Sequence, residues 1–188
     1  MNLIIEQLQA DHKQLVRVLY HLEREAKSFI GLNKGGEARL ETVLDILDYV
    51  QVYPEIWHHP MEDVIYQVLL EKNAVTASVL TDLMAEHETL EVLTENLQHM
   101  VDGLTQAAVV GQQRVRFLKA CSHYVARQLH HMEQEQKLLF PLLTSSFESQ
   151  DWETVALRFK KQQSLDESKL QEYTGRYQVI ANSSAVTC

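Results

Sequence analysis

Glycine, proline and cysteine are scarce in this sequence: its 188 residues include 6 Gly, 3 Pro and 2 Cys. A sheet protein with many tight turns needs more glycine and proline, so their scarcity favours helices. The two cysteines, Cys121 and the terminal Cys188, make no disulfide framework. We therefore expect a helical protein in a reducing, cytoplasmic setting.

Long apolar runs and excess positive charge are also missing. No uncharged apolar run approaches the ~20 residues that a membrane span needs. The amino terminus has an early carboxylate at Glu6, where a signal peptide would have a basic start. A net charge of −9 would repel a phosphate backbone and an anionic lipid surface. The sequence therefore predicts no membrane segment and no nucleic-acid partner.

Apolar residues recur at helical spacing through most of the chain. In the first stretch, for example, Leu8, Leu15, Leu19 and Leu22 fall on one face. Four such stretches occur without strand-like alternation, which predicts an all-α, up-down-up-down four-helix bundle. The expected long helices span about 3–29, 37–72 (interrupted by Pro54 and Pro60), 75–105 and 113–143, the last ending near Pro141.

The remaining residues predict a helical appendix on this bundle. We expect the bundle over 1–145, one or two further helices over 146–180 packed on it, and a flexible tail over 181–188. Ser164 and Glu167 have the spacing of a capping box for the last helix.

Nine histidines are the unusual feature of the composition, and several of them recur in a repeated pattern. The segment Asp11-His12 and the apolar residues after it match Glu86-His87, 75 positions later. A second match relates His58 to His131, which is 73 positions further along. Two helical hairpins that face each other would bring all these histidines together.

Two of the repeated segments contain a histidine and a glutamate four residues apart, a spacing that places both side chains on one face of a helix. The other two long helices each carry one histidine within an apolar stripe. An inward polar group costs several kcal/mol unless it is satisfied. We therefore predict that six side chains meet in the bundle core as metal ligands: His12, His58, Glu62, His87, His131 and Glu135.

Four imidazoles and two carboxylates indicate a particular kind of metal site. Mixed nitrogen and oxygen donors suit iron, whereas calcium and magnesium prefer oxygen alone. Six donors are too many for one tetrahedral structural zinc ion. We therefore expect two iron ions that share both carboxylates and an oxo or hydroxo bridge, with manganese or zinc as weaker alternatives. Each ion would be five-coordinate, with one position open for a small ligand.

This ordered series resembles the haemerythrin-like HHE cation-binding family. The segment from His58 to Asp63 and the pattern from His131 through Glu135 to Pro141 are close to the local motifs of that family. The resemblance covers roughly residues 3–143 and implies a helical bundle around a di-iron site. It also implies oxygen carriage or sensing, iron handling, or a response to nitrosative stress.

One position departs from the oxygen-carrying members of that family. Those proteins use five histidines, and the fifth lies four residues after the first histidine of the third helix, where this sequence has Glu91. The resemblance therefore shifts towards the sites with four histidines and two glutamates in proteins proposed to repair damaged iron–sulfur centres. The sequence leaves three roles open for Glu91: a further ligand, a hydrogen-bond acceptor for a ligand, or a surface residue.

Several assignments around the site stay open. His59 and Asp63 are also four residues apart, so they form a rival to the pair one residue earlier. Glu55 and Gln128 each precede a predicted glutamate ligand by seven residues and are candidates for hydrogen bonds to the ligands. The remaining histidines that we expect at the surface or its boundary include His21, His99 and His123.

The predicted function is that of a cytoplasmic, non-haem di-iron protein that binds O₂, NO or a peroxide, or handles iron, in sensing or a stress response. An alternative is a di-iron enzyme on the same scaffold: an oxidase, a peroxide- or NO-handling enzyme, or one that repairs iron–sulfur centres. A structural bundle without metal is the third class. The sequence leaves open a homodimer and does not identify a redox partner.

Overall fold

The computed structural model describes residues 2–30, 36–72, 77–106, 111–162 and 175. These residues are helical almost throughout, and none of them lies in a strand. The predicted all-α class is therefore confirmed. The helices are α1 (Leu3–Ile30), α2 (Gly36–Tyr53), α3 (His59–Lys72), α4 (Ala77–Gln106), α5 (Gly111–Gln134), α6 (Phe140–Ser146) and α7 (Ser149–Gln162), with π-helical turns η1 (Pro54–His58) and η3 (Glu135–Leu139).

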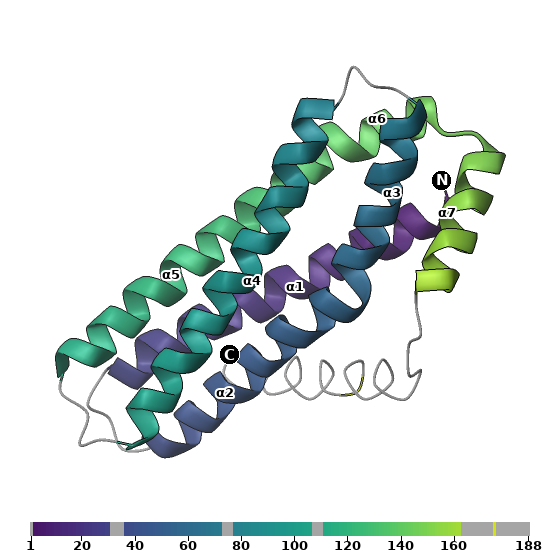
Figure 1. Cartoon of the computed structure of the whole chain (residues 1–188). Helices are drawn as coiled ribbons and strands as arrows, with labels where there is room; N and C mark the ends of the chain where they lie inside the picture. The colour runs from purple at the N-terminus through teal and green to yellow at the C-terminus, as the bar shows by residue number, and fades with distance from the viewer. Residues whose placement is uncertain (1, 31–35, 73–76, 107–110, 163–174, 176–188) are drawn as a thin grey trace.

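The long helices form the predicted up-down-up-down bundle (Figure 1). Helix α1 packs against α2 and α5, and α4 packs against the same two helices. Two of the four rods are composite, because α3 continues α2 through η1 and α6 follows α5 through η3. No helix in the described residues is long and apolar enough to cross a membrane.

Each π-helical turn ends two residues before a proline, Pro60 or Pro141. A proline has no N–H, and its ring crowds the carbonyl four residues earlier, so a regular α-turn is disfavoured there. In the widened turns the backbone N–H groups of His59 and Phe140 donate to carbonyls five residues earlier. The helix therefore widens just before Pro60, where the sequence predicts an interruption. It also continues through Pro141, where the sequence predicts that the helix ends.

Two apolar clusters fill the interior, one on each side of a polar layer. The first joins the later turns of α1 and α4 to α2 and α5, and the second joins their first turns to α3, α6 and α7. Along α1 the boundary falls between Leu8 and Leu15, and along α4 it falls between Leu83 and Leu90. The layer between the clusters is shielded from water, so its charged groups must be balanced from within.

Helix α7 is the C-terminal extension and packs against α3 (Figure 1). Val155 and Phe159 are buried in the second apolar cluster, and the Phe159 ring meets Trp57 edge to face with centroids 5.1 Å apart. Arg158 donates to both carboxylate oxygens of Glu71, at 2.7 and 2.8 Å. The predicted capping box at Ser164 and the predicted tail over 181–188 lie outside the described residues.

Candidate metal centre

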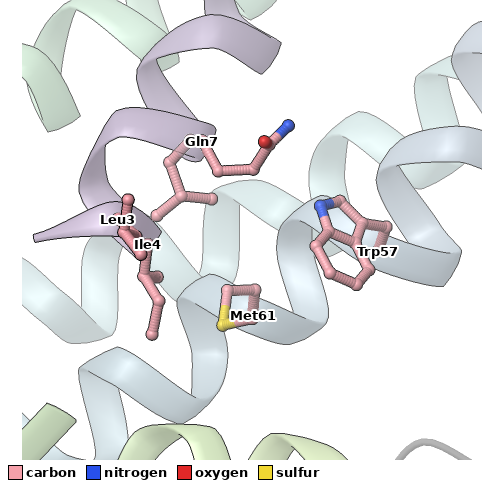
Figure 2. Close-up of a pocket in the computed structure, with 6 residues that line it drawn as sticks. Leu3, Ile4, Gln7, Trp57 and Met61 are labelled. Carbon is pink, nitrogen blue, oxygen red and sulfur yellow. The ribbon is translucent and has the colours of Figure 1, made fainter.

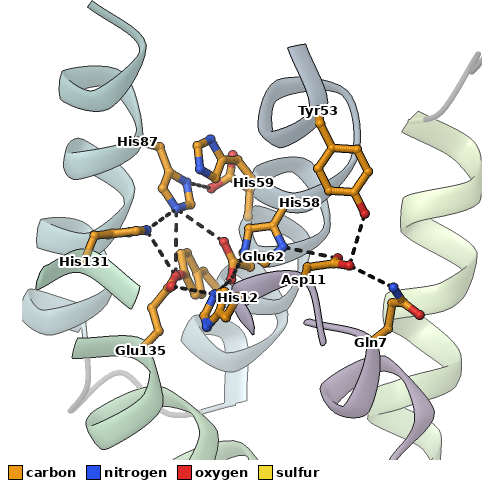
Figure 3. A network of polar contacts seen from close by, with 12 residues as sticks. Gln7, Asp11, His12, Tyr53, His58, His59, Glu62, His87, His131 and Glu135 are labelled. Atoms are coloured by element: carbon orange, nitrogen blue, oxygen red, sulfur yellow. Dashed lines mark hydrogen bonds and ion pairs between the residues drawn. The ribbon is translucent and has the colours of Figure 1, made fainter. Parts of the chain in front are cut away.

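The six side chains that the sequence predicts as metal ligands all lie in the polar layer, where Figure 3 shows them converging. Every one of the four long rods contributes, because a helical spacing of four residues keeps each histidine–glutamate pair on one face. None of the six is more than 7% exposed. They come from α1 (His12), η1 (His58), α3 (Glu62), α4 (His87), α5 (His131) and η3 (Glu135).

Their donor atoms form two groups that share both glutamates. Within each group all the donor atoms lie within 4.8 Å of one another. The first group contains His12, His58, Glu62 and Glu135, and the second contains Glu62, His87, His131 and Glu135.

Glu62 directs one carboxylate oxygen towards each group. Its Oε1 atom lies 3.2 Å from Nε2 of His58 and 3.6 Å from Nε2 of His12. Its Oε2 atom lies 3.5 Å from Nε2 of His87. Neighbouring donors that each lie about 2.1 Å from one ion are separated by about 3 Å, so these distances are close to those of a ligand shell.

The carboxylate of Glu135 also directs one oxygen towards each group. Its Oε2 atom lies 3.3 Å from Nε2 of His12, and its Oε1 atom lies 3.3 Å from Nε2 of His131. The Tyr66 hydroxyl also donates to Oε1, which fixes the carboxylate plane. Sequence reasoning missed Tyr66, although its position four residues after Glu62 places it on the same face of α3.

Several polar atoms of the site are buried without a hydrogen-bond partner. Within the described part of the chain, they include Nε2 of His12 and His58, both oxygens of Glu62, and Oε2 of Glu135. Burying charged groups in this way costs several kcal/mol unless an opposite charge compensates. A cation among these atoms would satisfy them together. The donor set therefore fits a metal ion.

Both buried carboxylates are ionised. Burial and the second carboxylate act to raise the pKa of Glu62, but the surrounding imidazoles outweigh them and hold it well below its usual value. Burial acts in the same direction on Glu135, and His131 and His12 outweigh it, so that pKa is also well below its usual value. Two negative charges thus lie at the centre of an apolar core.

The imidazoles balance those charges by holding protons when no metal is bound. Burial alone would lower the pKa of His58, but Glu62 and Asp11 raise it to about 10. Burial also opposes protonation of His87, whereas Asp63, Glu135 and Glu62 raise its pKa to about 12. A metal ion would displace these protons, because a ligating imidazole is neutral.

The Nδ1 atoms of three predicted ligands face carboxylates on other helices. Such a contact fixes the proton on Nδ1 and leaves Nε2 to bind a metal. Two of these carboxylates directly precede a predicted ligand. Each repeated acid–histidine dipeptide therefore supplies one predicted ligand and also a carboxylate that contacts a histidine of another helix. The pairs are His58 with Asp11 (3.4 Å), His87 with Asp63 (3.1 Å) and His131 with Glu86 (3.2 Å).

Asp11 is itself held in place by two donors (Figure 3). Its Oδ1 atom accepts hydrogen bonds from the Tyr53 hydroxyl at 3.1 Å and from the Gln7 amide at 2.8 Å. Its Oδ2 atom therefore stays directed at His58. The sequence signal for this role is the repeated acidic residue before each histidine, whose partner could not be assigned without the helix packing.

His59 is a further buried histidine in the layer, at 5% exposure. Its ring stacks on that of His87 with centroids 4.1 Å apart, and its donor atom lies within 4.8 Å of those of His87 and His131. Burial and the neighbouring His87 lower the pKa of His59 well below its usual value, so the ring is neutral. The structure thus places both His58 and His59 inside, whereas Asp63 contacts His87 from outside the donor groups.

Other residues in the open assignments lie elsewhere. Glu91 is exposed and belongs to neither donor group. Gln128 donates to the hydroxyl of Tyr124 at 3.1 Å, and Tyr124 belongs to the first apolar cluster. The expected surface or boundary position is wrong for His21, which is 4% exposed and lies 3.4 Å from Glu25.

An apolar pocket of about 160 Å³ lies between the beginning of α1 and the segment where η1 joins α3 (Figure 2). Leu8 in its wall is one helical turn before His12, and Met61 directly precedes Glu62. The other residues that line it are Leu3, Ile4, Gln7 and Trp57.

A helical bundle with histidines and glutamates clustered at its core defines a class of metal-binding α-helical proteins. A family model described as the hemerythrin HHE cation binding domain matches residues 3–143, and the chain belongs to this family. A comparison with curated proteins gave no significant match. The fold and the clustered donors thus agree with a cation-binding protein.

Proposed function

We propose that this protein holds two iron ions in the polar layer. His12 and His58 would bind one ion, and His87 and His131 would bind the other. Mixed imidazole and carboxylate donors suit iron better than calcium or magnesium. The carboxylates of Glu62 and Glu135 would bridge the two ions.

The observation that carries this proposal is the division of each carboxylate between the two donor groups. Both oxygens of Glu62 face imidazoles of different groups, at 3.2 Å from His58 and 3.5 Å from His87. At a site for a single ion, the carboxylate oxygens that bind the ion would all face the imidazoles of one group. Two shared carboxylates favour a pair of ions.

An oxo or hydroxo bridge would complete a five-coordinate shell with two histidines and two carboxylate oxygens at each ion. An open coordination position beside a redox-active pair suits a small ligand such as O₂, NO or a peroxide. The apolar clusters on either side keep bulk water from the layer. We therefore propose reversible small-ligand binding, in sensing or a stress response, as the function.

The first test is metal content. Purified protein loaded anaerobically with ferrous iron is expected to hold two ions per chain, and Glu62→Ala and Glu135→Ala are each expected to hold fewer than one. Glu133→Ala is the matched control, because Glu133 is an exposed glutamate near Glu135 that pairs with Lys137. One ion per chain in the parent protein, or unchanged content in both variants, would contradict the paired site.

The second test separates binding from turnover. Admitting O₂ to the anaerobic di-ferrous protein should produce an oxo-bridged charge-transfer band, and NO is admitted to a second di-ferrous sample. A band that reverses when the gas is removed indicates carriage or sensing. Consumption of many equivalents of O₂, peroxide or NO per chain would instead favour a di-iron enzyme.

A further inference from the structure

We infer that Tyr53 gives up one electron and its phenolic proton when the iron-loaded protein meets hydrogen peroxide, and that Tyr49 supplies a second electron and proton. The two tyrosines would then form a redox route from the polar layer into α2. This inference rests on the proposed iron site, where the peroxide would bind, and it gives a function to two residues that bind no metal.

Two successive polar contacts connect Tyr53 to the site (Figure 3). The hydroxyl of Tyr53 donates to Oδ1 of Asp11 at 3.1 Å, and Oδ2 of Asp11 lies 3.4 Å from Nδ1 of His58. A continuous path of polar contacts therefore joins the phenol to an imidazole that the proposed function assigns to one ion.

Asp11 is the base that this oxidation requires. A phenol that loses an electron becomes a strong acid, so a proton acceptor must lie within hydrogen-bond reach. Asp11 meets this condition and belongs to neither donor group that shares the glutamates, so a metal ion at the site would leave its carboxylate free. Burial and the charge of Asp11 raise the pKa of Tyr53 above its usual value, so the phenol keeps its proton until it is oxidised.

Two other buried tyrosines are less suited to this role. Tyr66 donates to Oε1 of Glu135, but that carboxylate is a proposed metal ligand, and its low pKa makes it a poor proton acceptor. The hydroxyl of Tyr124 accepts a hydrogen bond from the amide of Gln128, and an amide takes up no proton. Of these three tyrosines, Tyr53 is the one whose carboxylate partner lies outside the proposed ligands.

Tyr49 lies one helical turn before Tyr53, on the same face of α2. Their rings stack with centroids 5.3 Å apart and an angle of 9° between the ring planes. Tyr49 is fully buried and Tyr53 is 6% exposed, so a radical on either ring would be shielded from reductants in the solvent. The stack therefore provides a second electron close to the first.

One molecule of hydrogen peroxide would use both tyrosines. Its O–O bond breaks, and it takes up two electrons and two protons to form two molecules of water. Tyr53 supplies one electron, and its proton passes through Asp11, whereas Tyr49 supplies the other electron and proton. Two neutral phenoxyl radicals remain. Without a reductant they join through one carbon–carbon bond between the rings, and each displaced ring hydrogen moves to its phenolic oxygen.

The first test adds one equivalent of hydrogen peroxide to the di-ferric protein and freezes the sample at early times. We expect the electron paramagnetic resonance spectrum of a tyrosyl radical, which narrows when the tyrosines carry ring deuterium. The radical should be lost in Tyr53→Phe and kept in Tyr124→Phe. Tyr124 is the matched control, because it is equally buried but bonded to Gln128.

The second test examines the product at late times. The parent protein should show dityrosine fluorescence, and its tryptic peptide 40–72 should lose two hydrogen atoms and yield no fragments between residues 49 and 53. Tyr49→Phe should keep the early radical and lose this cross-link. A cross-link between any other pair of tyrosines would overturn the role of the stack.

Iron content is measured on every sample, and variants are compared at equal bound iron. Two irons per chain without a tyrosyl radical, or a radical that persists in Tyr53→Phe, would overturn the role of Tyr53 and leave the paired site intact. Fewer than two irons in the parent would overturn both proposals. If Tyr53→Phe does not fold, the cross-link between residues 49 and 53 and its loss in Tyr49→Phe decide the question.

Discussion

The hydroxyl of Tyr66 reaches the centre of the site without belonging to either donor group. It donates to Oε1 of Glu135, and its ring lies against His87 with centroids 5.8 Å apart. Burial and the adjacent carboxylates raise the pKa of Tyr66 well above its usual value, so the phenol keeps its proton and remains a donor. Its contribution is therefore to hold Glu135 in the orientation that serves both sides.

Tyr66→Phe should retain two irons per chain but weaken their binding about 10-fold, because Glu135 loses the hydrogen bond from this hydroxyl. Transfer of iron to a chelator, followed optically, measures the effect. Tyr124→Phe is the control: Tyr124 is equally buried, but its hydroxyl bonds to Gln128. Equal chelator transfer in the two variants would show that the Tyr66 hydroxyl does not position Glu135.

Cys121 should be chemically inert in the native protein. Burial, aided by Glu23, raises the pKa of its thiol to about 12, so only about one molecule in ten thousand carries a thiolate at pH 8. In a Cys188→Ser variant, we expect a disulfide reagent to label Cys121 at least about 100-fold more slowly in buffer than in urea. Rapid labelling in buffer would mean that α5 separates readily from its neighbours.

The residues predicted from the sequence are those whose signal lies within one helix. A spacing of four residues suffices to pair His58 with Glu62, and an apolar stripe suffices to orient His12 inwards. The roles of Glu86 and Tyr66 could not be predicted, because each contacts a ligand on another helix. Such contacts depend on how the helices are rotated about their axes, which the hydrophobic pattern fixes only coarsely.

For the helices, the prolines predict where the helix is disturbed, whereas packing decides what form the disturbance takes. Pro54 and Pro60 predict a disturbed helix between α2 and α3, and the disturbance lies there. Its form, a π-helical turn with His59 bonded to the carbonyl of Pro54, was not predictable from a missing N–H alone. A kink, a break or a widened turn each relieves the same clash. The surrounding core selects the form that keeps His58 and His59 buried.

Helix α7 provides a test of how the extension contributes to stability. Phe159 is 6% exposed against α3, whereas Leu157 on the other face is 70% exposed. Phe159→Ala should therefore lower the free energy of unfolding of the metal-free protein by about 3 kcal/mol, and Leu157→Ala by less than about 0.5 kcal/mol. Urea unfolding measures both. Similar losses would show that α7 is not docked through Phe159.

At the scale of the whole molecule, two apolar clusters enclose one charged layer, and stability depends on how that layer is neutralised. Without metal, protons on the imidazoles balance Glu62 and Glu135. With metal, the ions would take over that role and the protons would leave. The two forms should therefore respond differently to pH.

The metal-free protein should lose stability as the pH rises from 6.5 to 9. Burial lowers the pKa of His58, but Glu62, Asp11 and Glu135 raise it to about 10, against about 6.5 in the unfolded chain. The stabilisation from this proton is complete below pH 6.5 and is lost as the pH approaches 10, at no more than about 1.4 kcal/mol per pH unit. In the metal-loaded protein, Nε2 of His58 would bind an ion and contribute no such slope.

Urea unfolding of both forms at pH 6.5, 7.5 and 9 measures the difference. His58→Gln serves as the control, since it removes this titrating group without adding charge and should reduce the pH slope of the metal-free protein by the share of this one proton, while His87 keeps its own share. Equal pH slopes for the metal-free parent and His58→Gln would mean that His58 carries no proton in the folded core. The two buried carboxylates would then need another source of positive charge, and His87, whose pKa is raised to about 12, would be the next group to test.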